Sequence, residues 1–248
     1  MKQIILVITA LTLALRIHAQ DNSGTIIYNE LIELNVQLDG EMAAFAAMIP
    51  KEQRSQKMLC YTTGVSLYKN IKKPEESSHN TDNNGVQVMI KMDMPDEITY
   101  KDLQAGKTFE QKEFMGRQFL VEGDVKKYTW KMTGKQKEVA GYPCQEATTV
   151  RDKDIITAWF TPAIPVSTGP GSLGNLPGMI LEAHIGSRVH ITTAKIEEGK
   201  VDNTLLVKPK GGKKITEDEF EKIVEEKTAE MQGENGGGDR IIIRKEIH

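Results

Sequence analysis

The stretch GPGSLGNLPGMILEAHI, residues 169–185, decides which fold this chain adopts. Its glycine spacing, GxGxxG counted from Gly169, matches the pattern of a dinucleotide-binding turn. That site needs a strand before the glycines, a helix that starts among them and an acidic residue about 20 positions later. Pro177 and Gly178 disfavour a helix here, so we reject a nucleotide site.

The same residues fit a shaped turn between two strands. In a type II turn, proline sets φ at the second position and glycine supplies the positive φ of the third. Pro177 and Gly178 hold these positions, and the apolar residues that follow are typical of a buried strand. The predicted structural turn motif comprises Gly174, Asn175, Leu176, Pro177 and Gly178.

Short segments with strand-like alternation fill most of the chain between residues 24 and 198, with turn signals every 8–12 residues. The sequence therefore predicts a mainly β fold, with a single curved antiparallel sheet that forms a half-barrel. A short helix within 39–50 is expected to cover it, and the polar residues 71–85 are expected to form a loop. The expected hairpin turns are Gly116-Arg117, Gly123-Asp124, Gly134-Lys135 and Gly186-Ser187.

A C-terminal helix is predicted over residues 213–231. Thr216 with Glu219 three positions later is the pattern of a capping box, and Ile215 with Phe220 is that of a hydrophobic staple. The predicted division is a signal peptide over 1–19, a β domain over 20–208, and a helix with a flexible tail over 209–248.

The N-terminus has the pattern of a secretory signal peptide. A basic start precedes a 12-residue apolar run at 4–15, too short to span a bilayer, and Ala19 precedes the expected cleavage point. Removing Lys2 and Arg16 with that segment leaves 30 basic and 35 acidic side chains. The chain is therefore expected to be exported to the periplasm or secreted, with no transmembrane segment and no nucleic-acid partner.

Two cysteines follow the signal peptide, Cys60 and Cys144. In an oxidising compartment, two cysteines are most simply interpreted as one disulfide that closes a long loop. The alternative is a pair of buried free thiols, because spacing alone does not show that the two Cα atoms approach one another.

Three segments carry a family resemblance: YTWKMTGKQKEVA (128–140), GYPCQEATTV (141–150) and AWFTPAIPVSTGPGSLGNLPGMILE (158–182). They resemble the GLPGLI family of exported Bacteroidota proteins over about residues 60–200. Asn175 stands where that family usually has its first glycine, and Met179 replaces leucine. The family has no established biochemical function. The strand patterns are also similar to those of periplasmic lipoprotein carriers, which implies a curved sheet with helices on its concave face.

Other residue patterns suggest chemistry less strongly. Met89, Met92 and Met94 have soft thioether ligands suited to copper(I), although methionine also fills protein cores. His184 and His190 flank the Gly186 turn and are positioned to meet across a hairpin, without an evident third metal ligand. We find no convergent nucleophile, acid and base, so neither an enzyme nor a cofactor is predicted.

Two functions remain open. The first is binding of a hydrophobic ligand or lipidated chain in the concavity of the sheet, which predicts a cavity. The second is docking on an envelope partner, which predicts a filled core and an exposed apolar patch. The expected ligand-binding residues are Trp130, Trp159, Phe160, Met179, Ile180 and Leu181.

Overall fold

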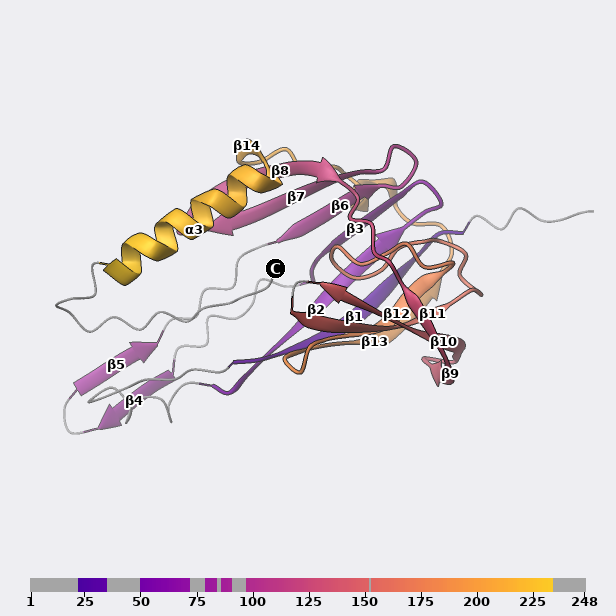
Figure 1. Cartoon of the computed structure of the whole chain (residues 1–248), viewed down its shortest axis with the longest axis horizontal. Coiled ribbons are helices and arrows are strands. Elements are labelled where there is room, and N and C mark those ends of the chain that lie inside the picture. The colour runs from indigo at the N-terminus through magenta and orange to yellow at the C-terminus, as the bar shows by residue number, and fades with distance from the viewer. Residues whose placement is uncertain are drawn as a thin grey trace, which may run out of the picture.

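A computed structural model describes residues 22–34, 50–71, 79–83, 86–90, 97–151 and 153–233. Strands make up most of the described chain, and one long helix, α3, follows them (Figure 1). The elements are β1 (Gly24–Glu33), β2 (Glu52–Tyr61), β3 (Val65–Asn70), β4 (His79–Asn83), β5 (Val86–Ile90), β6 (Ile98–Asp102), β7 (Lys107–Phe114), β8 (Arg117–Asp124), β9 (Lys131–Val139), β10 (Tyr142–Arg151), β11 (Asp154–Thr161), β12 (Met179–Ile185), β13 (Val189–Glu198), the 3-10 helix η2 (Asn203–Leu205), β14 (Lys213–Thr216) and α3 (Glu217–Gly233).

Twelve strands form one open sheet in the order β14-β8-β7-β6-β3-β2-β1-β13-β12-β11-β10-β9. Every neighbouring pair is antiparallel except β14 and β8, which run parallel. The sheet is curved but stays open, and its two edge strands, β14 and β9, lie on opposite sides of the molecule (Figure 1). The predicted mainly β class with a single curved, antiparallel sheet is confirmed.

The predicted hairpin turns are half correct. Gly116 and Gly186 have positive φ values of 71° and 56° and lie in the β7–β8 and β12–β13 turns. Gly123 instead pairs with Thr108 inside the β7–β8 ladder, so the chain does not turn there. Strand positions accept glycine even though it is the commonest turn residue, and local composition does not separate the two uses.

The turn expected at Gly134-Lys135 is also wrong. Gly134 lies within β9 with φ of 82°, close to a register shift in the β9–β10 ladder. The chain reverses seven residues later, where Ala140 and Gly141 have φ values of 50° and 85°. Residue pairs with positive φ at both positions match the right-handed twist of a hairpin, which explains the position of the turn.

Part of the region expected to be a loop is a strand. Residues 79–83 form β4, which pairs with β5 in a separate two-stranded sheet. The expectation for 71–85 is therefore wrong at β4, where polar side chains obscured the strand. The signal peptide, the covering helix expected within 39–50 and the tail after residue 233 lie outside the described residues, apart from Pro50.

The segment between β11 and β12, residues 162–178, folds back over the sheet instead of protruding from it. Ile164, Val166, Leu173 and Leu176 of this segment are 1–3% exposed and belong to the main core. The backbone amide of Met179 donates to the carbonyl of Ile164 at 3.0 Å. We call residues 162–178 the covering segment, because it fills the inner face of the sheet that the sequence had suggested as a cavity.

The turn at the end of the covering segment is tighter than the predicted type II turn. The amide of Gly178 donates to the carbonyl of Leu176 at 2.8 Å, which closes a three-residue γ-turn around Pro177. Proline and glycine hold the expected positions, and Gly178 has the expected positive φ, at 151°. Asn175 also has positive φ, at 63°, and asparagine tolerates this conformation best after glycine.

The C-terminal helix begins at the predicted capping box, four residues later than the predicted range of 213–231. The Thr216 amide donates to Glu219 Oε2 at 2.8 Å, and the Glu219 amide donates to Thr216 Oγ1 at 3.2 Å, which confirms the capping box. Residues 213–216, expected as the start of the helix, instead form β14. The helix packs Phe220 and Ile223 onto Phe119, Val121 and Ile215, a second apolar cluster beside the main core.

We expect Thr216→Ala to lower the free energy of unfolding by about 1 kcal/mol, because it removes the cap of α3. Chemical denaturation of the two proteins measures this difference. Thr228→Ala is the matched control, since Thr228 Oγ1 donates to the Val224 carbonyl within the helix and alanine favours the helix interior. An equal loss in both variants would contradict the capping role.

The predicted disulfide is not formed. Cys60 and Cys144 are buried free thiols on β2 and β10, which four other strands separate in the sheet. Cys60 Sγ lies 3.8 Å from Thr25 Oγ1, and Cys144 Sγ donates to the Tyr142 carbonyl at 3.5 Å. Burial raises the pKa of both thiols, that of Cys144 to about 11, which makes them poor nucleophiles.

Candidate functional site

Strands β9–β13 present one surface away from the core, which we call the outer face. Their register places side chains on it in three rows that run across the strands. Successive strand residues alternate between faces, so the core takes the residues between these rows, such as Ile156, Ala158 and Ala183. The rows are Glu146–Trp159–Glu182–Thr192, Thr148–Thr157–His184–His190 and Val150–Ile155.

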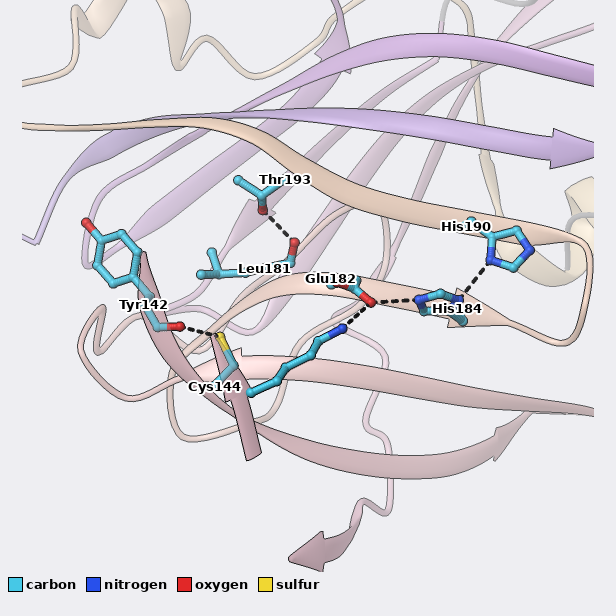
Figure 2. Close-up of polar contacts among 8 residues, drawn as sticks. Tyr142, Cys144, Leu181, Glu182, His184, His190 and Thr193 are labelled. Atoms are coloured by element: carbon cyan, nitrogen blue, oxygen red, sulfur yellow. Dashed lines mark hydrogen bonds and ion pairs between the residues drawn. The ribbon is translucent and has the colours of Figure 1, made fainter. Parts of the chain in front are cut away.

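A chain of charged and ring side chains lies along the outer face (Figure 2). Lys137 Nζ lies 2.6 Å from Glu182 Oε1, and the same oxygen is 2.8 Å from His184 Nε2. His184 Nδ1 is in turn 2.8 Å from His190 Nδ1, and the two rings are nearly perpendicular, at 87°. His190 Nε2 ends the chain 3.1 Å from the carbonyl of Ser187. The expectation that the two histidines meet across the hairpin is confirmed.

Glu182 is held as a carboxylate. Burial raises its pKa, but hydrogen bonds from Lys137 and His184 and their charges outweigh that effect and leave the pKa below its ordinary value. The side chain is only 14% exposed, against 36% for Lys137 and 35% for His184. Glu182 is therefore the buried member of the group, and its hydrogen bonds orient the half-exposed side chains of Lys137 and His184.

The two tryptophans play different parts. Trp159 is half-buried on the outer face, where Lys137 Nζ lies over its ring, 4.3 Å from the centroid. Trp130 is half-buried at the covering segment, where its Nε1 donates to the carbonyl of Gly174 at 2.8 Å. The structure therefore separates two residues that were expected to line one cavity.

The other four residues expected to bind a ligand lie in the core. Phe160, Met179, Ile180 and Leu181 are 0–1% exposed, and the apolar side chains of the covering segment belong to the same cluster. Tyr28 Oη donates to the Ile180 carbonyl at 2.6 Å across this interior. Hydrophobic contact with a ligand at these residues requires that the covering segment first move away.

A buried lysine fastens the covering segment to the sheet. Lys101, on β6, donates from Nζ to the Leu173 carbonyl at 2.6 Å and reaches the Gly169 carbonyl and Thr168 Oγ1 at 3.4 Å. Ser66 Oγ lies 3.0 Å from the same Thr168 hydroxyl. Burial lowers the pKa of Lys101 to about 7, against the opposing attraction of Glu110.

The sequence carries no signal for this lysine. In the segment EITYKDL, a charged residue that alternates with apolar ones reads as solvent-facing. Its acceptors are main-chain carbonyls of a segment about 70 positions away, and every residue type supplies a carbonyl. Only the covering segment's fold reveals that Lys101 points inward.

Most of the methionine pattern lies outside the residues that the structure describes. Met92 and Met94 lie outside the described residues, and for Met89 only the backbone strand β5 is described. Within the part of the chain that the structure describes, no three or more His, Cys, Asp or Glu side chains are grouped to hold a metal ion. Among the same residues, no helix combines the length and hydrophobicity needed to cross a bilayer.

Comparison with models of known protein families identifies the family to which this chain is related. Residues 65–219 match the model of the N-glycanase peptide, N-terminal domain (PNGase F-II). The chain belongs to this family. The matched range runs from β3 to the start of α3 and includes the covering segment and the whole outer face. No curated protein matches the sequence.

Solved structures show the same fold in a longer protein. The structure of PNGF-II in space group C2 superposes with a TM-score of 0.55 at 14% sequence identity, covering 82% of this chain and 32% of that one. The structure of PNGF-II in space group P21 gives the same TM-score and identity, covering 82% and 33%. The chain therefore spans about a third of the length of the solved proteins it resembles.

Proposed function

We propose that this chain is a non-enzymatic, exported envelope protein that docks on a protein partner through the outer face. The observation that carries the proposal is an apolar pair at the β10–β11 end of that face. Val150 and Ile155 lie directly opposite one another across the hairpin and are 67% and 60% exposed. Two apolar side chains side by side in water supply the kind of centre around which protein interfaces form.

Polar groups surround this pair as the rim of an interface would. Arg188 lies 3.7 Å from Asp154 at the hairpin end, and the threonine and histidine row borders the pair on the other side. The free edge beside it is not the favoured surface. Edge strand β9 carries Lys131, Lys135 and Lys137 and an interior glycine, features that protect edges from pairing with other strands.

The filled inner face supports docking over carriage of a hydrophobic ligand. The apolar side chains of the covering segment occupy the concave side on which that hypothesis placed a ligand. Lys101 and Trp130 also hold this segment by hydrogen bonds to its carbonyls. A carrier function stays a prediction that requires the segment to open.

Site-specific photo-crosslinking in the cell envelope of the native host tests the docking proposal. A crosslinking residue at Val150 is expected to give one discrete protein adduct, which Ile155→Glu in the same chain abolishes, and a crosslinking residue at Ile155 with Val150→Glu is the reciprocal test. The control site is Val207, an equally exposed apolar residue at 58% that lies outside the outer face. Equal adducts at Val207, or none at either hairpin site, overturn the proposal.

Mass spectrometry of the purified protein addresses the two remaining predictions. Cleavage after Ala19 is expected to leave a chain that begins at Gln20, as the signal-peptide pattern requires. Under native conditions without delipidation, the docking proposal predicts a bare polypeptide. A retained lipid-sized adduct would favour the carrier hypothesis in its place.

The resemblance to GLPGLI proteins is also retained as a proposal, supported by the backbone of the turn. Positive φ at Asn175 accounts for a glycine being usual there, and the close contact of Gly178 accounts for the second glycine. A set of related sequences would test it. We expect only glycine, asparagine or aspartate at position 175 and glycine alone at position 178.

A further inference from the structure

We propose that His184 and His190 form a binding site for a divalent transition-metal ion, with copper(II) bound most tightly. The two rings come from β12 and β13, where the residues are direct cross-strand partners beside the hairpin turn that contains Gly186. Their Nδ1 atoms face one another 2.8 Å apart. Both side chains are half-exposed, so an ion can reach them from solvent.

The outer ends of the two rings fix where their protons lie. His184 Nε2 faces the Glu182 carboxylate, which Lys137 holds at 2.6 Å, and His190 Nε2 faces the Ser187 carbonyl. A carboxylate and a carbonyl only accept hydrogen bonds, so each ring carries its N–H on Nε2. The two Nδ1 atoms then face one another at hydrogen-bond distance, an arrangement that needs either a proton carried by one of them or a metal ion that takes that proton's place.

This arrangement is the one that metal-binding histidines adopt. A ligating imidazole usually donates its second N–H to a carboxylate or a backbone carbonyl, which fixes the tautomer and the ring orientation. Here both kinds of partner are already present, the Glu182 carboxylate for His184 and the Ser187 carbonyl for His190. The site is therefore oriented before any ion arrives.

The separation of the nitrogen atoms suits a single ion. Metal–nitrogen bonds of about 2.0–2.1 Å put two cis ligands roughly 2.8 Å apart at a right angle and roughly 3.4 Å apart at the tetrahedral angle. The observed 2.8 Å falls at the right-angled end of this range. Right-angled coordination by nitrogen and oxygen is typical of copper(II) and nickel(II), and copper(II) stands highest in the general order of affinity.

The ion would keep positions for other ligands. Within the described residues no third His, Cys, Asp or Glu side chain completes the site, so water or a group on the docked partner fills the remaining positions. The hard cations magnesium and calcium prefer oxygen ligands and are not expected to bind. The inference does not depend on the docking proposal, because two imidazoles bind a metal whether or not the outer face has a partner.

Titration of the untagged chain from Gln20 with copper(II), followed by calorimetry and electron paramagnetic resonance, tests the site. We expect one ion per chain, with nitrogen hyperfine structure from two imidazoles. His184→Ala or His190→Ala should remove this binding, while His79→Ala with His248→Ala, the matched control, should leave it intact. Absence of one-to-one binding, or binding that survives His190→Ala, overturns the proposal.

Two further variants distinguish a built metal site from a mere pair of histidines. Glu182→Gln keeps an acceptor for His184 Nε2 but removes the negative charge beside the ligand, and should weaken copper(II) binding roughly 10–100-fold. Lys137→Met removes an ammonium that competes for Glu182 and repels the ion, and should strengthen binding. Unchanged affinity in both variants shows that Glu182 does not orient the ligand and overturns that part of the inference.

Discussion

Replacing Gly178 with alanine is expected to lower the free energy of unfolding by about 4 kcal/mol, among the largest effects of a single substitution. A Cβ atom built on Gly178 lies 2.1 Å from the carbonyl oxygen of Thr161 and 3.0 Å from Pro162 Cα. Both contacts are with backbone, so no side-chain rotation relieves them. The neighbouring Leu176 and Met179 are 1% and 0% exposed, which leaves the turn no room to shift.

Gly171→Ala is the control for this prediction, because it makes the same chemical change in the same covering segment. Gly171 also has positive φ, at 54°, but a Cβ atom there meets nothing within 4 Å. The control variant should lose only about 1 kcal/mol of unfolding free energy, which is the conformational cost of that φ for a residue with a Cβ atom. Urea denaturation and soluble yield compare the two variants, and similar losses would show that the close approach of Thr161 is not what requires Gly178.

The sequence predicted this position well because turn residues are local signals. Pro177 restricts one dihedral angle and Gly178 permits another, whatever the rest of the chain does. The sequence did not reveal the γ-turn or the contact with Thr161, since both depend on how the covering segment returns to β11. Local chemistry located the turn, and tertiary packing determined its form.

In the hairpin β10–β11, too, local sequence signals account for part of the structure and tertiary packing for the rest. The strands observed at 142–151 and 154–161 lie in the region that the sequence predicts to be filled with short strands, because β-branched residues run up to polar turn residues on both sides. Their register then places Val150 opposite Ile155 and leaves both in water. Periodicity finds a strand, but it does not show whether an apolar side chain at its end is covered.

The candidate site was predictable only in part. The six-residue spacing of His184 and His190 around Gly186 is a local hairpin signal, and it brought the rings together as expected. Glu182 lies two positions before His184 on the same face of one strand, a period-two pattern that could have identified it as a partner. Lys137 comes from β9, which β10 and β11 separate from β12 in the sheet, and no local spacing connects it to Glu182.

The last prediction concerns Lys101 and the pH dependence of stability. Its pKa is about 7 in the folded protein against an ordinary 10.5 in the unfolded chain. Between these values the unfolded chain holds a proton that the folded protein has released, so raising the pH favours folding. Lys101 is therefore expected to add up to about 1.4 kcal/mol of unfolding free energy per pH unit between pH 7 and pH 10.

Other groups oppose this trend at the alkaline end. The pKa values of Cys144 and Tyr61 are raised to about 11 and about 12, so the folded protein keeps protons there that the unfolded chain loses. Stability from these groups falls as the pH rises past their ordinary values, near 9 and 10. The contribution of Lys101 is therefore clearest as a difference between two proteins that share these groups.

The variant Lys101→Met isolates the contribution of Lys101 to the pH dependence of stability, because methionine fills similar space and does not titrate. Urea denaturation of both proteins from pH 6.5 to pH 9.5 should give curves that diverge, with the wild type gaining stability relative to the variant at every step above pH 7. Ser66→Ala is the control: it removes the hydroxyl that contacts Thr168 but no titrating group, so its curve should lie parallel to that of the wild type. Parallel curves for Lys101→Met as well would show that the buried amine keeps its proton, with the carbonyls of Leu173 and Gly169 stabilising it as a charged anchor of the covering segment.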